Sequence, residues 1–286
     1  MNTEQAFRTY RPLLFSIAYN MLGSVMDAED CVQETILRWH RAYSSGETEA
    51  IRFPRSYLCT IVTHLSLDQL CAARKQRDSY DGVWLPEPVL LPDPGEHVEA
   101  AEILSVAFLR LLETLAPIER AVFLLRQVFD YDYAEIARIV GKNEANCRQI
   151  AHRARRHLAA QSPRYTVTSE QQAQLFERFM RASSDGNVEQ LLGLLTRDVV
   201  LYSDGGENRE PVVGAQAVVQ ALLKAAHRVA QDTAWHWTTA AINGRPGMLV
   251  YAYNKLYAVI AFELLDERVQ EIDIIVNPDK LRHIQA

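Results

Sequence analysis

A proline-rich segment between Asp78 and Glu96 limits, more than any other feature, how this chain can fold. The segment contains Pro86, Pro88, Pro92 and Pro94, together with Gly82 and Gly95. Proline lacks a backbone N–H donor and clashes with the preceding helical turn, so no helix continues through this density of prolines. We therefore expect a linker over residues 78–98, with separate domains before and after it.

The composition is that of a globular protein. At about 150 residues per domain, a chain of 286 residues is long enough for two domains. An apolar content of 48% with 23% charged residues excludes a wholly disordered chain. No apolar stretch approaches the roughly 18–20 residues of a membrane span, and the N-terminus lacks the pattern of a secretory signal. We expect a cytoplasmic protein that does not bind a membrane.

The cysteines favour a structural role over a metal site. Cys31, Cys59, Cys71 and Cys147 contain no C-x-x-C pair, and each falls in an apolar helical pattern. Such residues are expected to be small buried hydrophobes in a reducing compartment. His64 and His152 each follow a cysteine closely, but two ligands do not make a zinc site. We expect neither a metal nor a cofactor.

The first 160 residues or so have a helical period. Apolar residues recur at helical spacing over residues 7–21, 28–39, 54–70, 103–115 and 118–128. Gly23 ends the first run, and Pro54 opens the third at a position that proline favours. We expect one all-α domain over residues 1–77 and a second over residues 99–162.

Beyond residue 169 the period changes. Helices are expected over residues 169–183, 188–195 and 214–229, and strands over residues 199–202, 233–242, 248–253, 256–264 and 269–276. Turn signals at Asn243-Gly244 and Asn254-Lys255 separate neighbouring strands of an antiparallel meander. Helices followed by such a meander predict a small α+β domain over residues 169–286.

Residues 133–158 have the spacing of a helix-turn-helix. The inner faces of the two helices are formed by Tyr133, Ile136, Ala137 and Val140, and by Cys147, Ala151, Ala154 and Leu158, with Gly141 at the turn. The outer face of the second helix carries Arg148, Gln149, His152, Arg153, Arg155 and Arg156. Charge alone leaves a solvated helix face as the alternative, but the spacing and the glycine favour binding in the DNA major groove.

Three motifs in order along the chain resemble the extracytoplasmic-function sigma factors. Residues 27–38 resemble their polymerase-binding helix, with Asp30, Gln33 and Glu34 on one exposed face. Residues 54–70 resemble their promoter-melting and −10-reading helix, and residues 112–158 resemble their −35-reading domain. On its own the acidic helix would be a solvated surface. The collinear order of the motifs is what makes the resemblance specific.

The resemblance implies partners and site residues. The expected partners are RNA polymerase core, through its β′ and β subunits, and promoter DNA. The β′ subunit would bind the acidic face formed by Asp30, Gln33 and Glu34. The −10 contacts would come from Arg55, Tyr57, Thr63, His64 and Arg74. Strand opening suits this mixture, because cations hold phosphates while rings hold unstacked bases. Core packing stays open as the alternative for Tyr57 and His64.

A finer resemblance concerns a subgroup with a fused SnoaL-like domain of the ketosteroid-isomerase superfamily. Its signatures match Trp84-Leu85-Pro86-Glu87-Pro88, Asp204-Gly205-Gly206 and Asn277-Pro278-Asp279-Lys280-Leu281, whereas Glu207-Asn208 departs from the usual pattern and lacks its lysine. The resemblance implies a cone-shaped domain that regulates in cis through these three motifs. Because Trp84 and Leu85 are large and apolar, we expect them in a groove, between the sigma domains or on the C-terminal domain.

We therefore expect a monomeric sigma factor that is regulated in cis and is not an enzyme. The acid–base candidates Tyr202, Asp204, His236 and Asp273 form no convincing catalytic pair. One alternative is a ketosteroid-isomerase-like enzyme or ligand sensor on a DNA-binding module, with a small molecule in the C-terminal domain. Another is a dimeric helix-turn-helix repressor that needs no polymerase. The acidic helix argues against the repressor.

Overall fold

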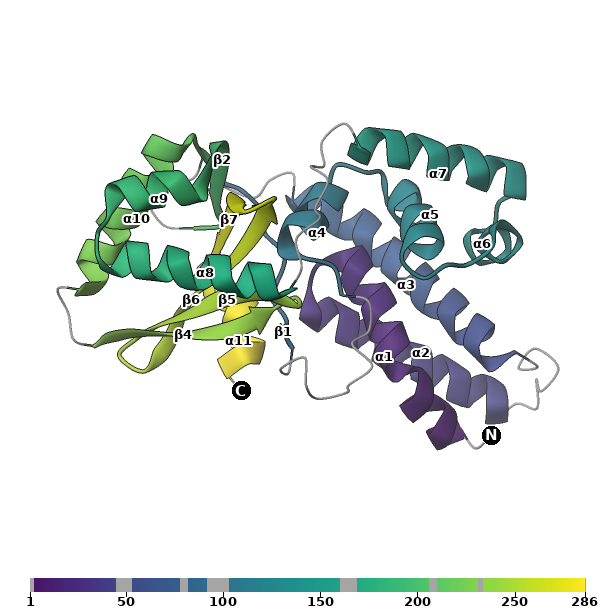
Figure 1. The fold of residues 1–286 in the computed structure, drawn as a ribbon. Coiled ribbons are helices and arrows are strands. Elements are labelled where there is room, and N and C mark those ends of the chain that lie inside the picture. The colour runs from purple at the N-terminus through teal and green to yellow at the C-terminus, as the bar shows by residue number, and fades with distance from the viewer. Residues whose placement is uncertain are drawn as a thin grey trace. The chain divides into compact units, whose positions relative to one another are not determined.

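The contacts of the chain divide it into two compact units (Figure 1). The structure, a computed structural model, describes residues 3–44, 53–77, 82–91, 103–159, 169–205, 210–230 and 234–285. Unit 1 gathers Met1–Ser79, His97–Leu104 and Leu111–Ser162, and unit 2 gathers Tyr80–Glu96, Ser105–Arg110 and Pro163–Ala286. This grouping cuts across the sequence-based segments, because most of the linker and residues 105–110 belong with the C-terminal domain.

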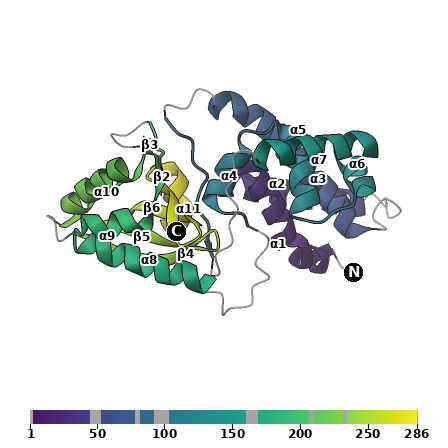
Figure 2. The ribbon, with the colours of Figure 1, turned by 45° about the horizontal axis from the view of Figure 1, so that its top comes forward.

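All the regular secondary structure in the described part of unit 1 is helical. α1 (Thr3–Leu22), α2 (Val25–Ser44) and α3 (Pro54–Arg77) pack against one another, and so do α5 (Pro117–Gln127), α6 (Tyr133–Val140) and α7 (Glu144–Ala159) (Figure 2). The two groups are in contact, because α5 touches α1 and α3, and α6 touches α3. Within the described part, no helix is both long and apolar enough to cross a membrane.

Local capping explains the turn between α6 and α7. Asp132 begins α6 with a capping box, in which its Oδ1 accepts a hydrogen bond of 2.7 Å from the Glu135 N–H. Gly141 ends α6 with φ 63°, a left-handed conformation that glycine adopts without strain. Asn143 then begins α7, because its Oδ1 accepts 2.8 Å from the Asn146 N–H. The predicted turn at Gly141 is confirmed.

α4 (Val106–Leu112) is shorter than the helix expected over residues 103–115. The Ser105 hydroxyl accepts a hydrogen bond of 3.3 Å from the Phe108 N–H, which starts the helix there. At the other end, the Thr114 hydroxyl donates 2.7 Å to the Leu111 carbonyl. Side-chain bonds to the backbone therefore set both ends, and the division between the units falls within α4, after Arg110.

Unit 2 contains a seven-stranded sheet in the order β1-β4-β5-β6-β7-β2-β3. The strands are β1 (Leu90–Leu91), β2 (Leu195–Ser203), β3 (Val212–Val213), β4 (Trp235–Ile242), β5 (Arg245–Ala252), β6 (Lys255–Leu265) and β7 (Arg268–Ile275). The predicted antiparallel meander is confirmed as β4 to β7. The parallel pairing of β2 with β7 and the addition of the linker strand β1 to β4 were not predicted.

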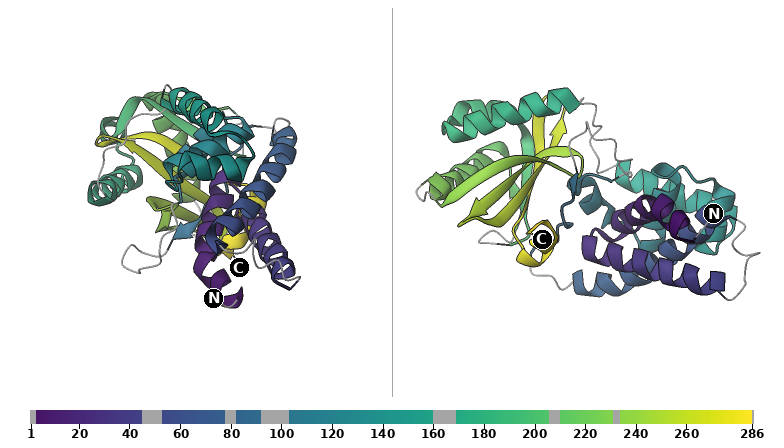
Figure 3. Two further views of the ribbon diagram at one scale, coloured as in Figure 1. Left: turned by 90° about the vertical axis from the view of Figure 1, so that its right-hand side faces the viewer. Right: turned by 90° about the horizontal axis from the view of Figure 1, so that it is seen from below.

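Two apolar layers cover the two faces of this sheet. α8 (Ser169–Ser184), α9 (Val188–Leu194) and α10 (Ala215–Ala230) lie on one face (Figure 3). There the rings of Phe176 and Phe179 pack edge to face with Phe262. Alternate residues of β6, such as Ala261, point to the other face, which Leu85 and Leu281 cover. Leu281 belongs to α11 (Pro278–Gln285), a helix that was not predicted. Helices followed by a meander confirm the expected α+β fold.

Candidate nucleic-acid and polymerase interfaces

The outer face of α7 is as the sequence predicted. The buried side chains of α7 are Cys147, Ile150, Ala151, Ala154 and Leu158. All six predicted −35 residues are exposed: Arg148, Gln149, His152, Arg153, Arg155 and Arg156. The helix therefore presents one apolar face to the rest of unit 1 and one basic face to solvent.

Two of these arginines are already engaged on the protein. Arg148 Nη2 lies 2.7 Å from Glu144 Oε2, and Arg153 Nε lies 3.5 Å from Glu119 Oε1. Among the described residues, no acidic side chain pairs with Arg155 or Arg156. These last two guanidinium groups are the ones best placed to neutralise phosphates.

The predicted polymerase face lies on α2. Asp30 and Gln33 are exposed, and Glu34 is half-exposed. Glu34 Oε1 accepts 2.8 Å from Arg38 Nε, and this hydrogen bond holds the pKa of Glu34 below its ordinary value. Nearer the start of the helix, Asp27 Oδ1 accepts 2.7 Å from the Gln69 amide, which ties α2 to α3. The acidic surface is therefore carried by a helix fixed in position.

The predicted −10 residues of α3 lie in several environments. Arg55 is exposed, with its guanidinium 5.0 Å from the ring centroid of Tyr131. Tyr57 is half-buried and packs at 5.9 Å against Trp39, which is the packing role left open above. His64 is exposed, and its Nε2 lies 2.5 Å from the Ile139 carbonyl oxygen of α6. Thus Arg55 and His64 contact the helix-turn-helix half of unit 1.

Two further −10 predictions do not fit this state of the protein. Thr63 is fully buried, with its hydroxyl unpaired in the described part of the chain. The period of α3 places Thr63 on the face that packs against other helices, so a contact with DNA would require that face to open. The side chain of Arg74 lies outside the described residues.

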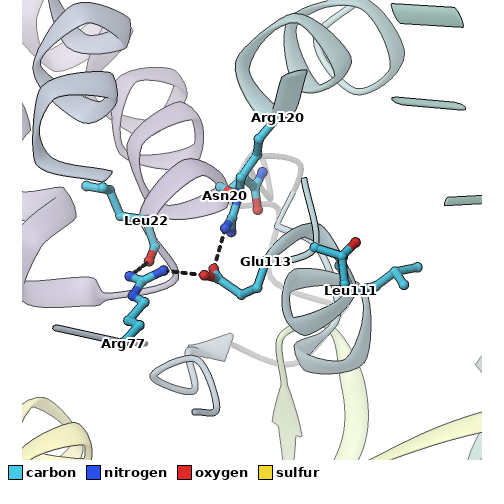
Figure 4. Close-up of polar contacts among 7 residues, drawn as sticks. Asn20, Leu22, Arg77, Leu111, Glu113 and Arg120 are labelled. Atoms are coloured by element: carbon cyan, nitrogen blue, oxygen red, sulfur yellow. Dashed lines mark hydrogen bonds and ion pairs between the residues drawn. The ribbon is translucent and has the colours of Figure 1, made fainter. Parts of the chain in front are cut away.

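A buried charge cluster joins α1, α3 and α5 (Figure 4). Arg120 is 1% exposed and donates to the Asn20 carbonyl at 3.1 and 3.0 Å. Glu113 pairs with Arg120, and with Arg77 Nη1 at 2.7 Å. Although burial opposes its charge, these two arginines hold the pKa of Glu113 below its ordinary value. This cluster was not predicted from the sequence, although a charged residue inside the apolar run of α5 was its signal.

The three motifs assigned to regulation meet within unit 2. Asp204 Oδ1 accepts hydrogen bonds from the Val276 N–H at 2.8 Å and the Asn277 N–H at 3.1 Å. Its Oδ2 accepts 2.9 Å from Lys280 Nζ, which also lies 5.1 Å from the ring centroid of Trp84. Lys280 therefore connects the linker motif to the glycine-rich motif, although the three motifs lie far apart in the chain.

The rest of the linker motif is also held on the C-terminal domain. Leu85 is 0% exposed, Pro86 and Pro88 are buried, and Glu87 is half-buried. The Pro88 carbonyl lies 2.8 Å from His283 Nε2 of α11. Of the two grooves expected for Trp84 and Leu85, the structure places these residues on the C-terminal domain.

Local geometry explains why glycine stands at position 205 and asparagine at position 277. A Cβ on Gly205 would meet Val276 Cγ2 at 2.9 Å, so glycine permits this close approach. Asn277 Oδ1 accepts a hydrogen bond of 3.0 Å from the Asp279 N–H at the start of α11. Pro278, between these two residues, is exposed to solvent. Gly206 lies outside the described residues.

Two of the four acid–base candidates of unit 2, Tyr202 and Asp273, lie side by side, and the other two have different neighbours. Asp204 is bound by Lys280, and the His236 ring stacks on Tyr251 at 4.9 Å. Tyr202 and Asp273 lie together beside Arg110, a residue that the sequence analysis did not single out. The cavity beneath α8 is about 10 Å³, the space of about one water molecule.

The cysteines largely follow the prediction. Cys31, Cys59 and Cys147 are buried, and burial raises the pKa of the Cys31 thiol to about 11. Cys71 is exposed, so its predicted burial was wrong. It lies on the solvent side of α3, where the apolar pattern of the helix weakens near its end.

Comparisons with known proteins give matches in both halves of unit 1. The family model Sigma-70 region 2 matches residues 6–77, and the family model Sigma-70, region 4 matches residues 105–158. The second match begins with Ser105–Arg110, the segment that the contacts assign to unit 2.

Similar proteins extend over nearly the whole chain. The ECF RNA polymerase sigma factor SigJ of Mycobacterium tuberculosis is 34% identical over 290 residues, which cover 96% of this chain and 91% of that protein. The probable ECF RNA polymerase sigma factor SigI of the same species is 30% identical, covering 98% and 95%. The crystal structure of SigJ has 30% identity and a TM-score of 0.77, covering 96% of this chain and 97% of that one. The similarity therefore includes both units.

Proposed function

This chain belongs to the extracytoplasmic-function sigma factors, which act in transcription initiation, and we propose that α2 binds polymerase, α3 reads the −10 element and α7 reads the −35 element. The observation that carries the proposal is the exposed basic face of α7 behind a capped turn at Gly141. The exposed Asp30 and Gln33 on α2 support the contact with polymerase. As partners we propose the β′ subunit for α2 and the β subunit for the helix-turn-helix half.

Run-off transcription with purified core polymerase tests this assignment. The Asp30→Arg variant reverses the charge on the α2 face, and we expect it to lower both core binding and transcript yield at least tenfold. Glu189→Arg is the matched control, because Glu189 is an exposed acid on α9 of unit 2. Wild-type yield from Asp30→Arg would contradict the role of α2.

We propose that promoter binding separates the two halves of unit 1. By their names, the two promoter elements lie about 25 base pairs apart, which is about 85 Å of duplex at 3.4 Å per base pair. His64 of α3 touches Ile139 of α6, so α3 and the helix-turn-helix cannot each reach its element in this state. A net charge of −6 also disfavours DNA binding by the protein alone. We therefore expect tight promoter binding only with core polymerase.

We propose that unit 2 regulates this activity in cis through its hold on the linker. Lys280 contacts Trp84 and Asp204, so it is the residue that joins the linker motif to the other two. We expect Lys280→Met to change run-off yield at least threefold, and the direction gives the sign of regulation. Lys255→Met, at an exposed lysine of β6, is the control. Equal yields from the two variants would contradict the proposal.

We propose that this protein works as a monomer in the cytoplasm, where polymerase and DNA lie, and that unit 2 is not catalytic. The engagement of Asp204 by Lys280 and the small cavity beneath α8 favour this over the enzyme and cavity-ligand alternatives. The exposed acidic face of α2 favours it over a dimeric repressor. Binding of the protein to a palindromic operator without polymerase would revive the repressor.

A further inference from the structure

A second buried charge cluster lies in unit 2, on the sheet face opposite α8 to α10. The Arg110 guanidinium lies 3.7 Å from the ring centroid of Tyr202. Its Nη2 is 2.6 Å from Glu271 Oε1, and its Nε is 3.8 Å from Asp273 Oδ1. β2 and β7 pair in parallel with Tyr202 beside Asp273, so the sheet itself holds the ring and the acids together.

The side chains of Tyr202, Glu271 and Asp273 have the chemistry of a cation site. An aromatic face attracts a cation through its quadrupole, and a guanidinium adds hydrogen bonds to carboxylates in its plane. The Asp273 side chain is 2% exposed and that of Glu271 is 13% exposed, so water competes little for either carboxylate. Among the described residues, no group of acids, histidines and cysteines is arranged to hold a metal ion.

Arg110 does not use all the hydrogen-bonding capacity of this site. Arg110 Nε, Glu271 Oε1 and Asp273 Oδ1 are buried, and in the described part their contacts with one another are ion pairs that lie outside hydrogen-bond geometry. Glu263 Oε1, in the register position across from Glu271, is likewise unpaired, although Arg245 lies 3.4 Å from it. A guanidinium tethered to α4 thus pairs with the acids without forming the planar fork that a free one can adopt.

The charge balance agrees with this geometry. Burial and the neighbouring Glu271 raise the pKa of Asp273, and burial also raises the pKa of Glu263. For Arg110, burial is outweighed by Glu271 and Asp273, so its pKa is raised and its positive charge is firmly held. The acids therefore face more negative charge than the nearby arginines balance.

We propose that Tyr202, Glu271 and Asp273 form a binding site for guanidinium-class cations, and that Arg110 is its resident occupant. A soluble guanidinium compound takes the site when Arg110 withdraws. Arg110 ends the segment that contacts assign to unit 2, and α4 continues at Leu111 in unit 1. The occupant of the site therefore decides whether the first turn of α4 is held on the sheet. The proposal does not depend on the assignment of α2, α3 and α7.

Chemical rescue of the full-length Arg110→Ala variant tests the site. We expect this variant to melt at a lower temperature than wild type, and methylguanidinium to restore part of the loss with saturation. At tenfold excess over Kd the rise should be on the order of 3 °C. Urea, which is neutral and of similar shape, should give no saturable rise at the same concentrations.

Two comparisons make the result decisive. Wild type should not respond, because Arg110 fills the site, and Arg110→Ala/Glu271→Gln should lose the response, because the nearest carboxylate is gone. A similar shift in all three proteins, or no saturable shift in Arg110→Ala, overturns the proposal. If Arg110→Ala does not accumulate in folded form, its refolding yield with methylguanidinium is compared with that in urea, and equal yields overturn the proposal.

Discussion

A single carboxylate explains why two distant motifs of unit 2 belong together. Asp204 is 4% exposed and uses both oxygens, one on the backbone at the start of α11 and one on Lys280. A buried charge is tolerated when it is paired and hydrogen-bonded in this way. The same lysine reaches Trp84, so the fit of the linker depends on the pairing of Lys280 with Asp204.

We expect Asp204→Asn to destabilise unit 2 strongly. The change leaves Lys280 buried without its counter-charge, and breaking one side of a buried pair costs about 3–5 kcal/mol. Urea unfolding followed by circular dichroism measures the loss. The control is Asp279→Asn, because Asp279 pairs with Arg282 while 70% exposed, and should lose less than about 1 kcal/mol. Equal losses would contradict the role of the buried pair.

The buried acids beside Arg110 predict a dependence on pH. Burial and Glu271 raise the folded-state pKa of Asp273 above its unfolded value of about 3.9. Folding therefore favours the protonated acid, and this stabilisation is present below about pH 4 and lost as pH rises through the folded-state pKa. Burial also raises the pKa of Glu263. The pKa of Arg110 is raised as well, so its guanidinium stays charged over this pH range.

The Asp273→Asn variant isolates this effect, because asparagine keeps the shape and cannot ionise. We expect the stability of wild type to fall, relative to the variant, as the pH rises from about 4 to 8. Thermal melts of both proteins at each pH measure the difference. Parallel pH profiles would show that Asp273 ionises in the folded protein as it does in the unfolded chain.

At the scale of elements, α7 carries the clearest prediction about DNA. Arg155 and Arg156 are exposed and without an acidic partner among the described residues, so each is expected to neutralise a phosphate. Replacing either by alanine should weaken promoter binding by the polymerase complex for all sequences alike. Each change should lower the slope of log affinity against log salt by about 1. Arg197→Ala, at an exposed arginine of β2, should leave the slope unchanged.

Local signals predicted the elements better than their partners. The inner spacing of Ile136 and Cys147 and the left-handed Gly141 are properties of neighbouring residues, and the helix-turn-helix was confirmed from them. The pairing of Glu113 with Arg120 and Arg77 was missed, because it depends on how three helices pack. Thr63 shows the same limit, since it was assigned to DNA by resemblance, while its burial depends on how α3 packs against other helices.

At the scale of the molecule, the linker is part of the C-terminal domain. Leu85 is buried in one apolar layer with Val106, Ile275 and Leu281. The sequence predicted a proline-rich break but not this burial, because Ile275 and Leu281 lie nearly two hundred residues further along the chain. Composition therefore marked the boundary of the helices correctly, while only the long-range contacts show to which domain the linker belongs.

This arrangement means that removal of the C-terminal domain leaves an incomplete surface behind. A chain that ends at residue 165 keeps Leu85 and Val106 but loses Ile275 and Leu281, against which they pack. It also keeps Arg110 without Glu271. We expect this truncation to bind a hydrophobic dye and to self-associate in size-exclusion chromatography, whereas the full chain should do neither.

A variant of the truncated chain separates this effect from any regulatory one. Leu85→Ser/Val106→Ser removes the exposed apolar side chains, so it should reduce dye binding and restore a monomer. Run-off yield from this repaired truncation, compared with the full chain, then reports the regulatory effect of the C-terminal domain without aggregation. If the unmodified truncation is already monomeric and binds no dye, the linker must find other cover, and its burial on the sheet would not be required for a soluble sigma factor.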